Sequence, residues 1–369
     1  MTTITSPSPP ARRPAWPGHA AALWSLGYGA LGLSWVFGAP GFPWGRSDPD
    51  PDRVLSVLAG AAPDPGGWWI AAFGVLSMLT ALALLRPNGH GPLGRVLRFL
   101  AWPMAVLLIL VIPDSRLMMG VAYTPLLLVA PLFDLDLGGT TVADAWPWPV
   151  CNQLLCVLGG LLLAAAALDR RRRRHDACGT CGRTDRDGWT LPAMAARWGR
   201  VAVYVAIAVP LVYCATRWSW ALGIPLGVSR EFLDEGAKDT PGIWLAGAYL
   251  ATFGACGGLL TLGLIQHWGE VFPRWIPGLR GRRVPPLLAV IPAGFVAIII
   301  TVAGLTYVRW TVAGRFALAE WGAWLPETFW PLWGAALAAA ALAYRLRRSG
   351  GCRRCGRGLD RADAVAGTG

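Results

Sequence analysis

Two cysteine pairs are the residues whose type and spacing point most directly to chemistry. Cys178 and Cys181 form one Cys-x-x-Cys pair, Cys352 and Cys355 form a second, and each pair is followed by Gly-Arg. Zinc favours four thiolates in a tetrahedron, and a Cys-x-x-Cys turn supplies two of them. Since neither pair completes a site alone, we expect one structural zinc ion shared by both pairs. The alternatives are independent reduced thiols and redox chemistry.

The elements that carry these pairs must lie in a membrane. Of the 369 residues, 54% are hydrophobic and only 15% are charged, with a mean hydropathy of +0.45. Soluble domains carry roughly 25% charged residues. The apolar residues form blocks near the ~20 residues that cross a hydrocarbon core as a helix. We therefore expect an all-α integral membrane protein with eight spans, at 20–40, 67–85, 96–112, 150–168, 201–224, 243–265, 285–306 and 328–346.

The distribution of charge predicts the orientation. With the amino terminus inside, the outer loops are 41–66, 113–149, 225–242 and 307–327. Most of the 21 acidic residues then lie outside, and most of the 33 basic residues lie inside. This is the positive-inside pattern. We expect a multi-pass protein of the cell membrane with both termini in the cytoplasm.

The arginine run 170–174 could also be a nucleic-acid patch. No nucleic-acid-binding fold surrounds the run, and it directly follows an apolar block. Contact with anionic lipid headgroups accounts for it more simply. The lipid bilayer is therefore the expected partner, and the net charge of +12 reports topology.

The chain contains an internal repeat. The segment YGALGLSWVFGAP (28–40) aligns without gaps with YCATRWSWALGIP (213–225), and further matches recur at a shift of 175 residues. We expect two four-helix repeats in parallel orientation, because an even number of helices inserts both copies the same way. The predicted divisions are a disordered amino terminus (1–19), repeat 1 (20–174), a linker (175–199), repeat 2 (200–348) and a tail (349–369).

One segment departs from this symmetry. Residues 117–133 (LMMGVAYTPLLLVAPLF) are almost long enough to span. If they did span, the next helix would place the arginine run 170–174 outside. Charge therefore favours a re-entrant or interfacial segment that packs on protein.

Polar residues at membrane depth are the candidate ligand contacts. Arg217 is the one charge well inside a predicted span, where an unpaired guanidinium is costly. We expect it to meet a carboxylate among Asp114, Asp234 and Glu320, or the amides of Asn152 and Gln153. Snorkelling to the outer interface is the alternative. The candidate ligand-binding residues are Arg217, Asn152, Gln153, Asp114 and Glu320.

Tryptophans are unusually frequent. Many of the 21, including Trp44 and Trp220, lie near predicted outer helix ends. An aromatic belt explains most of them. A vestibule lined by such rings could also hold an apolar or sugar-like ligand.

Three segments resemble a family of multi-pass membrane proteins from actinobacteria whose activity is uncharacterised. They are VIPDSRLMMGVAYTPLLLVAPLF, WPWPVCNQLLCVLGGLLLAAAAL and QHWGEVFPRWIPGLRGRRVPPLLAVIPA. The resemblance implies a membrane fold and no particular activity. A ribonuclease-domain label carried by some relatives finds no support here, because no soluble block with clustered acidic residues exists in this chain.

These patterns favour a non-catalytic protein that binds or moves a small amphiphilic ligand between its two repeats, with a cytoplasmic zinc clasp. A membrane scaffold or regulator whose basic, cysteine-bearing tails bind a cytosolic partner is the first alternative. An intramembrane enzyme is the second, although no set of acid, base and nucleophile is evident. The sequence predicts neither the oligomeric state nor the ligand.

Overall fold

A computed structural model describes residues 15–48, 56–86, 92–134, 139–174, 177–178, 188–274, 277–349 and 352. These residues are helical or irregular. No β-strand occurs among them, and a single bridge joins Val271 to Arg283. This confirms the predicted all-α class. Hydrocarbon offers no partner for backbone polar groups, so continuous apolar runs satisfy them within helices.

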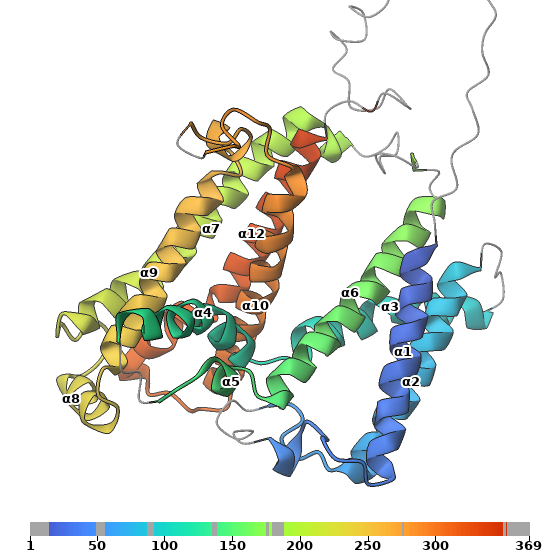
Figure 1. The fold of residues 1–369 in the computed structure, drawn as a ribbon, viewed down its shortest axis with the longest axis horizontal. Helices are drawn as coiled ribbons and strands as arrows, with labels where there is room; N and C mark the ends of the chain where they lie inside the picture. The colour runs from blue at the N-terminus through green and yellow to red at the C-terminus, as the bar shows by residue number, and fades with distance from the viewer. Residues whose placement is uncertain are drawn as a thin grey trace, which may run out of the picture.

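The two halves of the chain each contain four long helices (Figure 1). In the first half these are α1 (Trp16–Val36), α2 (Pro63–Leu85), α3 (Pro92–Val106), continued by the π-helical turn η2 (Leu107–Val111), and α6 (Trp148–Arg174). In the second half they are α7 (Pro192–Ala221), α9 (Ile243–Leu262), α10 (Pro286–Val312) and α12 (Trp330–Arg348). Several begin with proline, which suits the first turn because that turn needs no N–H partner.

Shorter elements connect the long helices. They are η1 (Gly45–Ser47), α4 (Arg116–Val129), η3 (Ala130–Phe133), α5 (Val142–Ala145), η4 (Gly188–Thr190), α8 (Arg230–Asp239), η5 (His267–Gly269), η6 (Leu318–Ala323) and α11 (Leu325–Thr328).

Each of the eight predicted spans coincides with one long helix, within a few residues at most ends. By length and apolarity, seven described helices could cross a membrane: α2, α3 with η2, α4 with η3, α6, α7, α9 and α10. Helices α1 and α12 are less apolar, since α1 carries polar and aromatic residues and α12 ends in arginines. A protein with several such helices is a membrane protein by composition, while the count of eight crossings stays a prediction.

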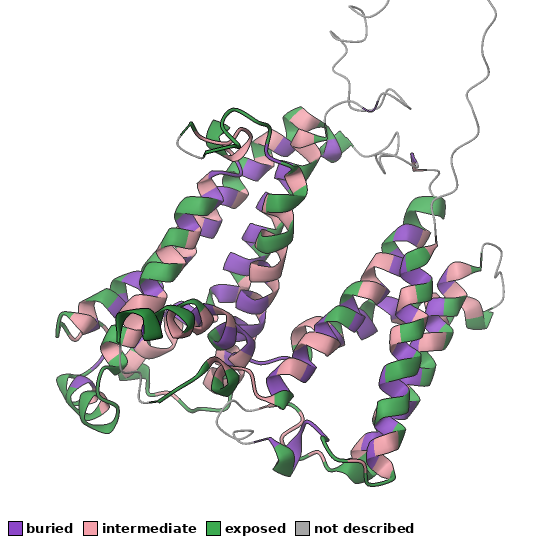
Figure 2. Ribbon diagram, in the orientation of Figure 1, coloured by how far each residue is buried: buried purple, intermediate pink, exposed green. Residues whose placement is uncertain are grey.

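The long helices have exposed faces, green in Figure 2. Many of their exposed residues are large and apolar. On α9, for example, Leu245, Leu259 and Leu260 are 70%, 64% and 68% exposed. Soluble proteins rarely expose contiguous apolar surface on this scale. A lipid environment accounts for it.

The two halves share some helix contacts and differ in others, since α2 also contacts α3 and α6, whereas α9 makes no comparable contact with α10 or α12 among the described residues. In the first half α1 contacts α2 and α6, and α3 contacts α6. In the second half α7 contacts α9 and α12, and α10 contacts α12. Figure 1 shows the halves side by side, with the arginine-rich carboxyl ends of α6 and α12 at the same edge. We call this the arginine edge and the other end the loop edge.

The halves meet near the loop edge, where α10 contacts η2 and α4. Helix α4 belongs to the first half in sequence but lies across the second half (Figure 1). Hydrogen bonds join the Tyr123 hydroxyl to the Ala246 carbonyl (3.3 Å) and the Tyr249 hydroxyl to the Ala122 carbonyl (3.2 Å). The middle of α4 thus rests on the first turns of α9. This placement agrees with an interfacial segment packed on protein.

The arginine-rich end of α12 has a structural role. Arg347 forms an ion pair with Glu270 (2.7 Å) and donates to the Leu264 carbonyl (2.8 Å). Arg348 donates to the Val284 carbonyl (2.8 Å). These contacts fasten the loop between α9 and α10 to the end of α12.

Candidate functional site

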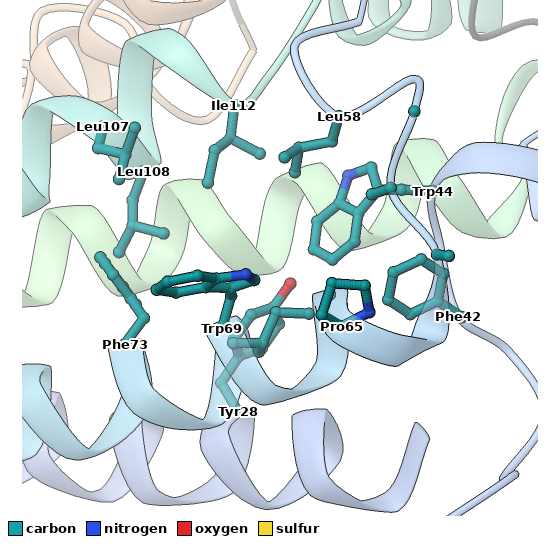
Figure 3. Close-up of a pocket in the computed structure, with 15 residues that line it drawn as sticks. Tyr28, Phe42, Trp44, Leu58, Pro65, Trp69, Phe73, Leu107, Leu108 and Ile112 are labelled. Carbon is teal, nitrogen blue, oxygen red and sulfur yellow. The ribbon is translucent and has the colours of Figure 1, made fainter. Parts of the chain in front are cut away.

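A cavity of about 350 Å³ lies near the loop edge of the first half (Figure 3). Its aromatic wall comes from α1, α2 and the loop that follows α1: Tyr28, Phe42, Trp44, Trp69 and Phe73. Leu58, Leu107, Leu108 and Ile112 close the other sides. We call it the aromatic cavity. Its volume lies within the roughly 300–1,000 Å³ range of small-molecule sites.

The local sequence explains this wall. Trp35, at the end of α1, meets Phe42 and Trp44 edge-on, at ring distances of 5.7 and 6.4 Å. This contact folds the loop back over the helix, and Phe42 and Trp44 are only 3% and 5% exposed. Trp69 on α2 is 73% exposed. The cavity is therefore roofed by buried rings and opens beside Trp69.

One hydroxyl group faces the aromatic cavity. The Tyr28 hydroxyl points toward it in Figure 3 and donates a hydrogen bond to Asn152 Oδ1 at 3.1 Å. Asn152 is fully buried and comes from α6. A ligand would therefore meet an almost entirely apolar surface with the Tyr28 oxygen as a fixed polar point.

An ion network holds the roof in place. Arg116 forms a bidentate contact with Asp48, which follows the Trp44 loop, and a second ion pair with Asp114, at 2.7 Å. Asp114 also accepts from Gln153 Nε2 at 2.8 Å. All three charges are paired, which suits their low exposure because an unpaired buried charge is costly.

The π-helical turn η2, which continues α3, forms part of the cavity wall. Residues Leu107 to Val111 form a π-helical turn, and Leu107 and Leu108 line the aromatic cavity. The same turn contacts α10 of the second half. Such π-turns often occur at functional sites. This one connects the cavity wall to the contact between the halves.

The second half has a charged cluster at the corresponding depth. The Arg217 guanidinium forms an ion pair with Glu327 and donates to the Gly322 carbonyl at 2.9 Å. It also lies over the rings of Tyr213 and Trp220, at 4.7 and 4.1 Å from their centroids. Glu327 is fully buried, and Arg217 is 8% exposed. The guanidinium is thus enclosed by two ring faces and a carboxylate.

The expectation that Arg217 meets a carboxylate is confirmed, but the choice of partner was wrong. Arg217 binds none of Asp114, Asp234 and Glu320, and it does not bind the amides of Asn152 and Gln153. Asp234 is exposed on α8, and the first-half residues bond elsewhere. Within η6, Arg217 binds the Gly322 carbonyl and not Glu320. The partner is Glu327. The repeat alignment pointed to this partner, because the shift of 175 residues pairs Glu327 with Asn152, which was itself a candidate partner of Arg217.

The five predicted ligand residues therefore do not form one site. Asp114 and Gln153 bind each other, and Asn152 supports Tyr28 at the aromatic cavity. Arg217 lies in its own cluster, and Glu320 belongs to η6, the turn whose Gly322 carbonyl accepts from Arg217. Of the rings that line the cavity, Phe42 and Trp44 lie in the loop after α1 and the others on α1 and α2. Only Trp44 was named among the tryptophans near predicted outer helix ends.

The cysteine pairs are partly within the described residues. Cys178 and Cys352 lie beside each other, with a distance of 3.9 Å between their sulfur atoms, and both are buried. Cys181 and Cys355 lie outside the described residues. No group of three potential metal ligands occurs within the parts of the chain that the structure describes. The contact brings together the segments that follow α6 and α12.

A second hollow of about 360 Å³ lies between α1 and α2. Leu26, Leu33, Trp68, Val75 and Met78 line it. Its serine, Ser25, bonds to the Ala21 carbonyl at 2.7 Å and offers a ligand little. A lipid chain suffices to fill it.

Comparison with known proteins finds no matching protein family, no similar curated protein and no matching solved structure.

Proposed function

We propose that this chain binds a small amphiphilic molecule in its aromatic cavity. The observation that supports this most directly is the cavity itself: about 350 Å³, walled by five aromatic residues, with one oriented hydroxyl group. An apolar tail would fill the space, and the Tyr28 oxygen would orient the polar end. The site lies inside the first half, whereas the sequence suggested the contact between halves.

The same proposal includes the architecture. Support for eight spans, arranged as two parallel four-helix repeats, comes from the contacts that both halves share: α1 and α7 each contact two helices of their own half, and α3 contacts α6 as α10 contacts α12. Eight spans also place both arginine-rich ends on one side, as the positive-inside pattern requires. The aromatic cavity then lies near the outer membrane surface. An amphiphile in the outer leaflet could reach it laterally beside Trp69.

The test is binding of single-chain amphiphiles to the purified protein, measured by native mass spectrometry. Leu58→Trp fills the cavity and should lower binding of dodecyl maltoside at least about tenfold. Leu222→Trp is the matched control, because Leu222 is 77% exposed and does not line the cavity. Equal binding by wild type and Leu58→Trp would refute the proposal.

We further propose that Cys178, Cys181, Cys352 and Cys355 share one structural zinc ion. Support comes from the 3.9 Å between the sulfurs of Cys178 and Cys352. In a tetrahedron of ~2.3 Å zinc–sulfur bonds the sulfurs stand about 3.8 Å apart. Such a clasp would tie the ends of α6 and α12 together.

Metal analysis of protein prepared without chelator decides this. We expect about one zinc per chain, reduced to about zero in Cys178→Ser. Cys256→Ser is the matched control, since Cys256 is exposed on α9 and should leave the zinc content unchanged. Wild-type protein without zinc would exclude the clasp.

A further inference from the structure

In the second half, a positively charged side chain lies against aromatic rings. The Arg217 guanidinium lies against the Tyr213 and Trp220 rings at 4.7 and 4.1 Å. Ring faces attract cations because of their quadrupole, most strongly when water is excluded. Arg217 is largely buried, so this attraction acts at close to full strength.

The first half has the corresponding rings without the cation. In the alignment of 28–40 with 213–225, Tyr28 and Trp35 correspond to Tyr213 and Trp220, whereas Arg217 is replaced by Gly32. No side chain at position 32 could enter. A Cβ there would lie 2.9 Å from the backbone nitrogen of Ala71, so α1 and α2 are too close.

The open space of the first half is instead the aromatic cavity. Tyr28 lines the aromatic cavity together with Phe42, Trp44, Trp69 and Phe73. At the shift of 175 residues, Trp69 aligns with Trp244 of the second half. Trp244 packs against Trp220 and Phe232 at ring distances of 5.3 and 5.6 Å. Trp244 thus packs against other rings, whereas its counterpart Trp69 lines the aromatic cavity.

We infer that the aromatic cavity binds the cationic headgroup of an amphiphile, an organic ammonium ion that supplies from outside the charge that Arg217 supplies in the second half. This inference rests on the proposed function and narrows its ligand class. Carrying the positive charge into the cavity would let several ring faces contact it, while the attached chain contacts Leu58, Leu107 and Leu108.

The surrounding charges select the kind of cation. The carboxylates of Asp48 and Asp114 are bound by Arg116, and Arg309 from α10 reaches the nearby Val111 carbonyl at 3.4 Å. The residue aligned with Glu327 is the neutral Asn152. None of the described residues that line the cavity carries a carboxylate, so a strongly hydrated ion such as sodium would gain too little there to lose its water. A weakly hydrated quaternary ammonium group would lose little and gain the ring contacts.

The experiment compares three probes with the same twelve-carbon chain, measured in nanodiscs by competition and native mass spectrometry. They are dodecyltrimethylammonium, dodecyl maltoside and dodecyl sulfate. We expect the cation to bind about tenfold or more tightly than the neutral probe, and the anion to bind most weakly.

Two variants locate the preference. Phe73→Leu removes a ring from the cavity and should lower the affinity for dodecyltrimethylammonium severalfold more than the affinity for dodecyl maltoside. Phe253→Leu is the matched control, since Phe253 is 43% exposed on α9, away from the cavity. An equal loss of preference in both variants would overturn the inference.

The possible failures are distinguishable. If all three probes bind equally and Leu58→Trp blocks them, the amphiphile site stands and the cation preference is refuted. If no probe is sensitive to Leu58→Trp, both the proposed function and this inference are refuted.

Discussion

At the scale of single residues, one position distinguishes the halves. Gly32 lets α1 approach α2 until backbone atoms touch, whereas Arg217 at the aligned position packs its side chain beside Gly247 of α9 and brings a charge inside. That charge needs Glu327, which is fully buried. The two residues form a unit, because either alone would leave an uncompensated charge.

Separating this pair should destabilise the protein. Arg217→Lys loses the planar contact with the rings and the fork to Glu327 and Gly322, and Glu327→Gln leaves a buried guanidinium unpaired. We expect a loss of about 3–5 kcal/mol for Glu327→Gln and a smaller loss for Arg217→Lys. Thermal unfolding in detergent measures both, with the exposed Arg315→Lys as control.

The double variant Arg217→Gly with Glu327→Asn copies the first half's residues and removes both charges. It should lose less stability than Glu327→Gln, since no unpaired charge remains. If Arg217→Lys matched the wild type instead, the arginine would be snorkelling to the membrane surface.

At the scale of elements, glycines set the contact between α1 and α2. A Cβ on Gly74 would lie 2.6 Å from the Gly29 Cα, and one on Gly67 would lie 2.6 Å from the Gly32 carbonyl oxygen. Small residues let membrane helices approach closely, and van der Waals packing then replaces the hydrophobic effect. This contact fixes Tyr28 relative to Trp69 and so shapes the aromatic cavity.

Gly74→Ala should therefore weaken the α1–α2 contact. Its Cβ meets backbone, which cannot rotate away, so we expect about 1–3 kcal/mol lower stability and weaker amphiphile binding. Gly27→Ala, on α1 with nothing within 4 Å of the added Cβ, should not lower either. Equal losses would mean that the close approach of α1 and α2 does not decide the effect, since alanine has the higher helix propensity in both variants.

The sequence was a good guide to the elements and a poor one to the contacts between them. Apolar runs such as 243–265 located α9 and the other long helices, because in lipid the backbone must form its own hydrogen bonds. Glu327 was missed because it lies in a predicted outer loop, where a carboxylate normally contacts water. The cavity at Tyr28 was not foreseeable from residue types alone, since it depends on how far α1, α2 and η2 stand apart.

At the scale of the whole molecule, the two ends hold the halves together differently. Near the loop edge, α4 and η2 of the first half rest on α9 and α10. Beyond the arginine edge, Cys178 and Cys352 meet after the ends of α6 and α12. The orientation in the membrane decides which of these contacts faces the reducing cytosol, where thiolates remain available for zinc.

Accessibility labelling of single cysteines, placed in a cysteine-free variant, tests that orientation. Asp50→Cys and Thr140→Cys should react with a membrane-impermeant maleimide added to intact cells, because both fall in predicted outer loops. Arg186→Cys should react only after the cells are opened, since the linker 175–199 is predicted to lie inside. Thr140→Cys is decisive for 117–133: if that segment spanned, position 140 would be inside and Arg186→Cys would be labelled from outside. That result would also carry the arginine run 170–174 outward, against the positive-inside pattern, and would refute the eight-span architecture.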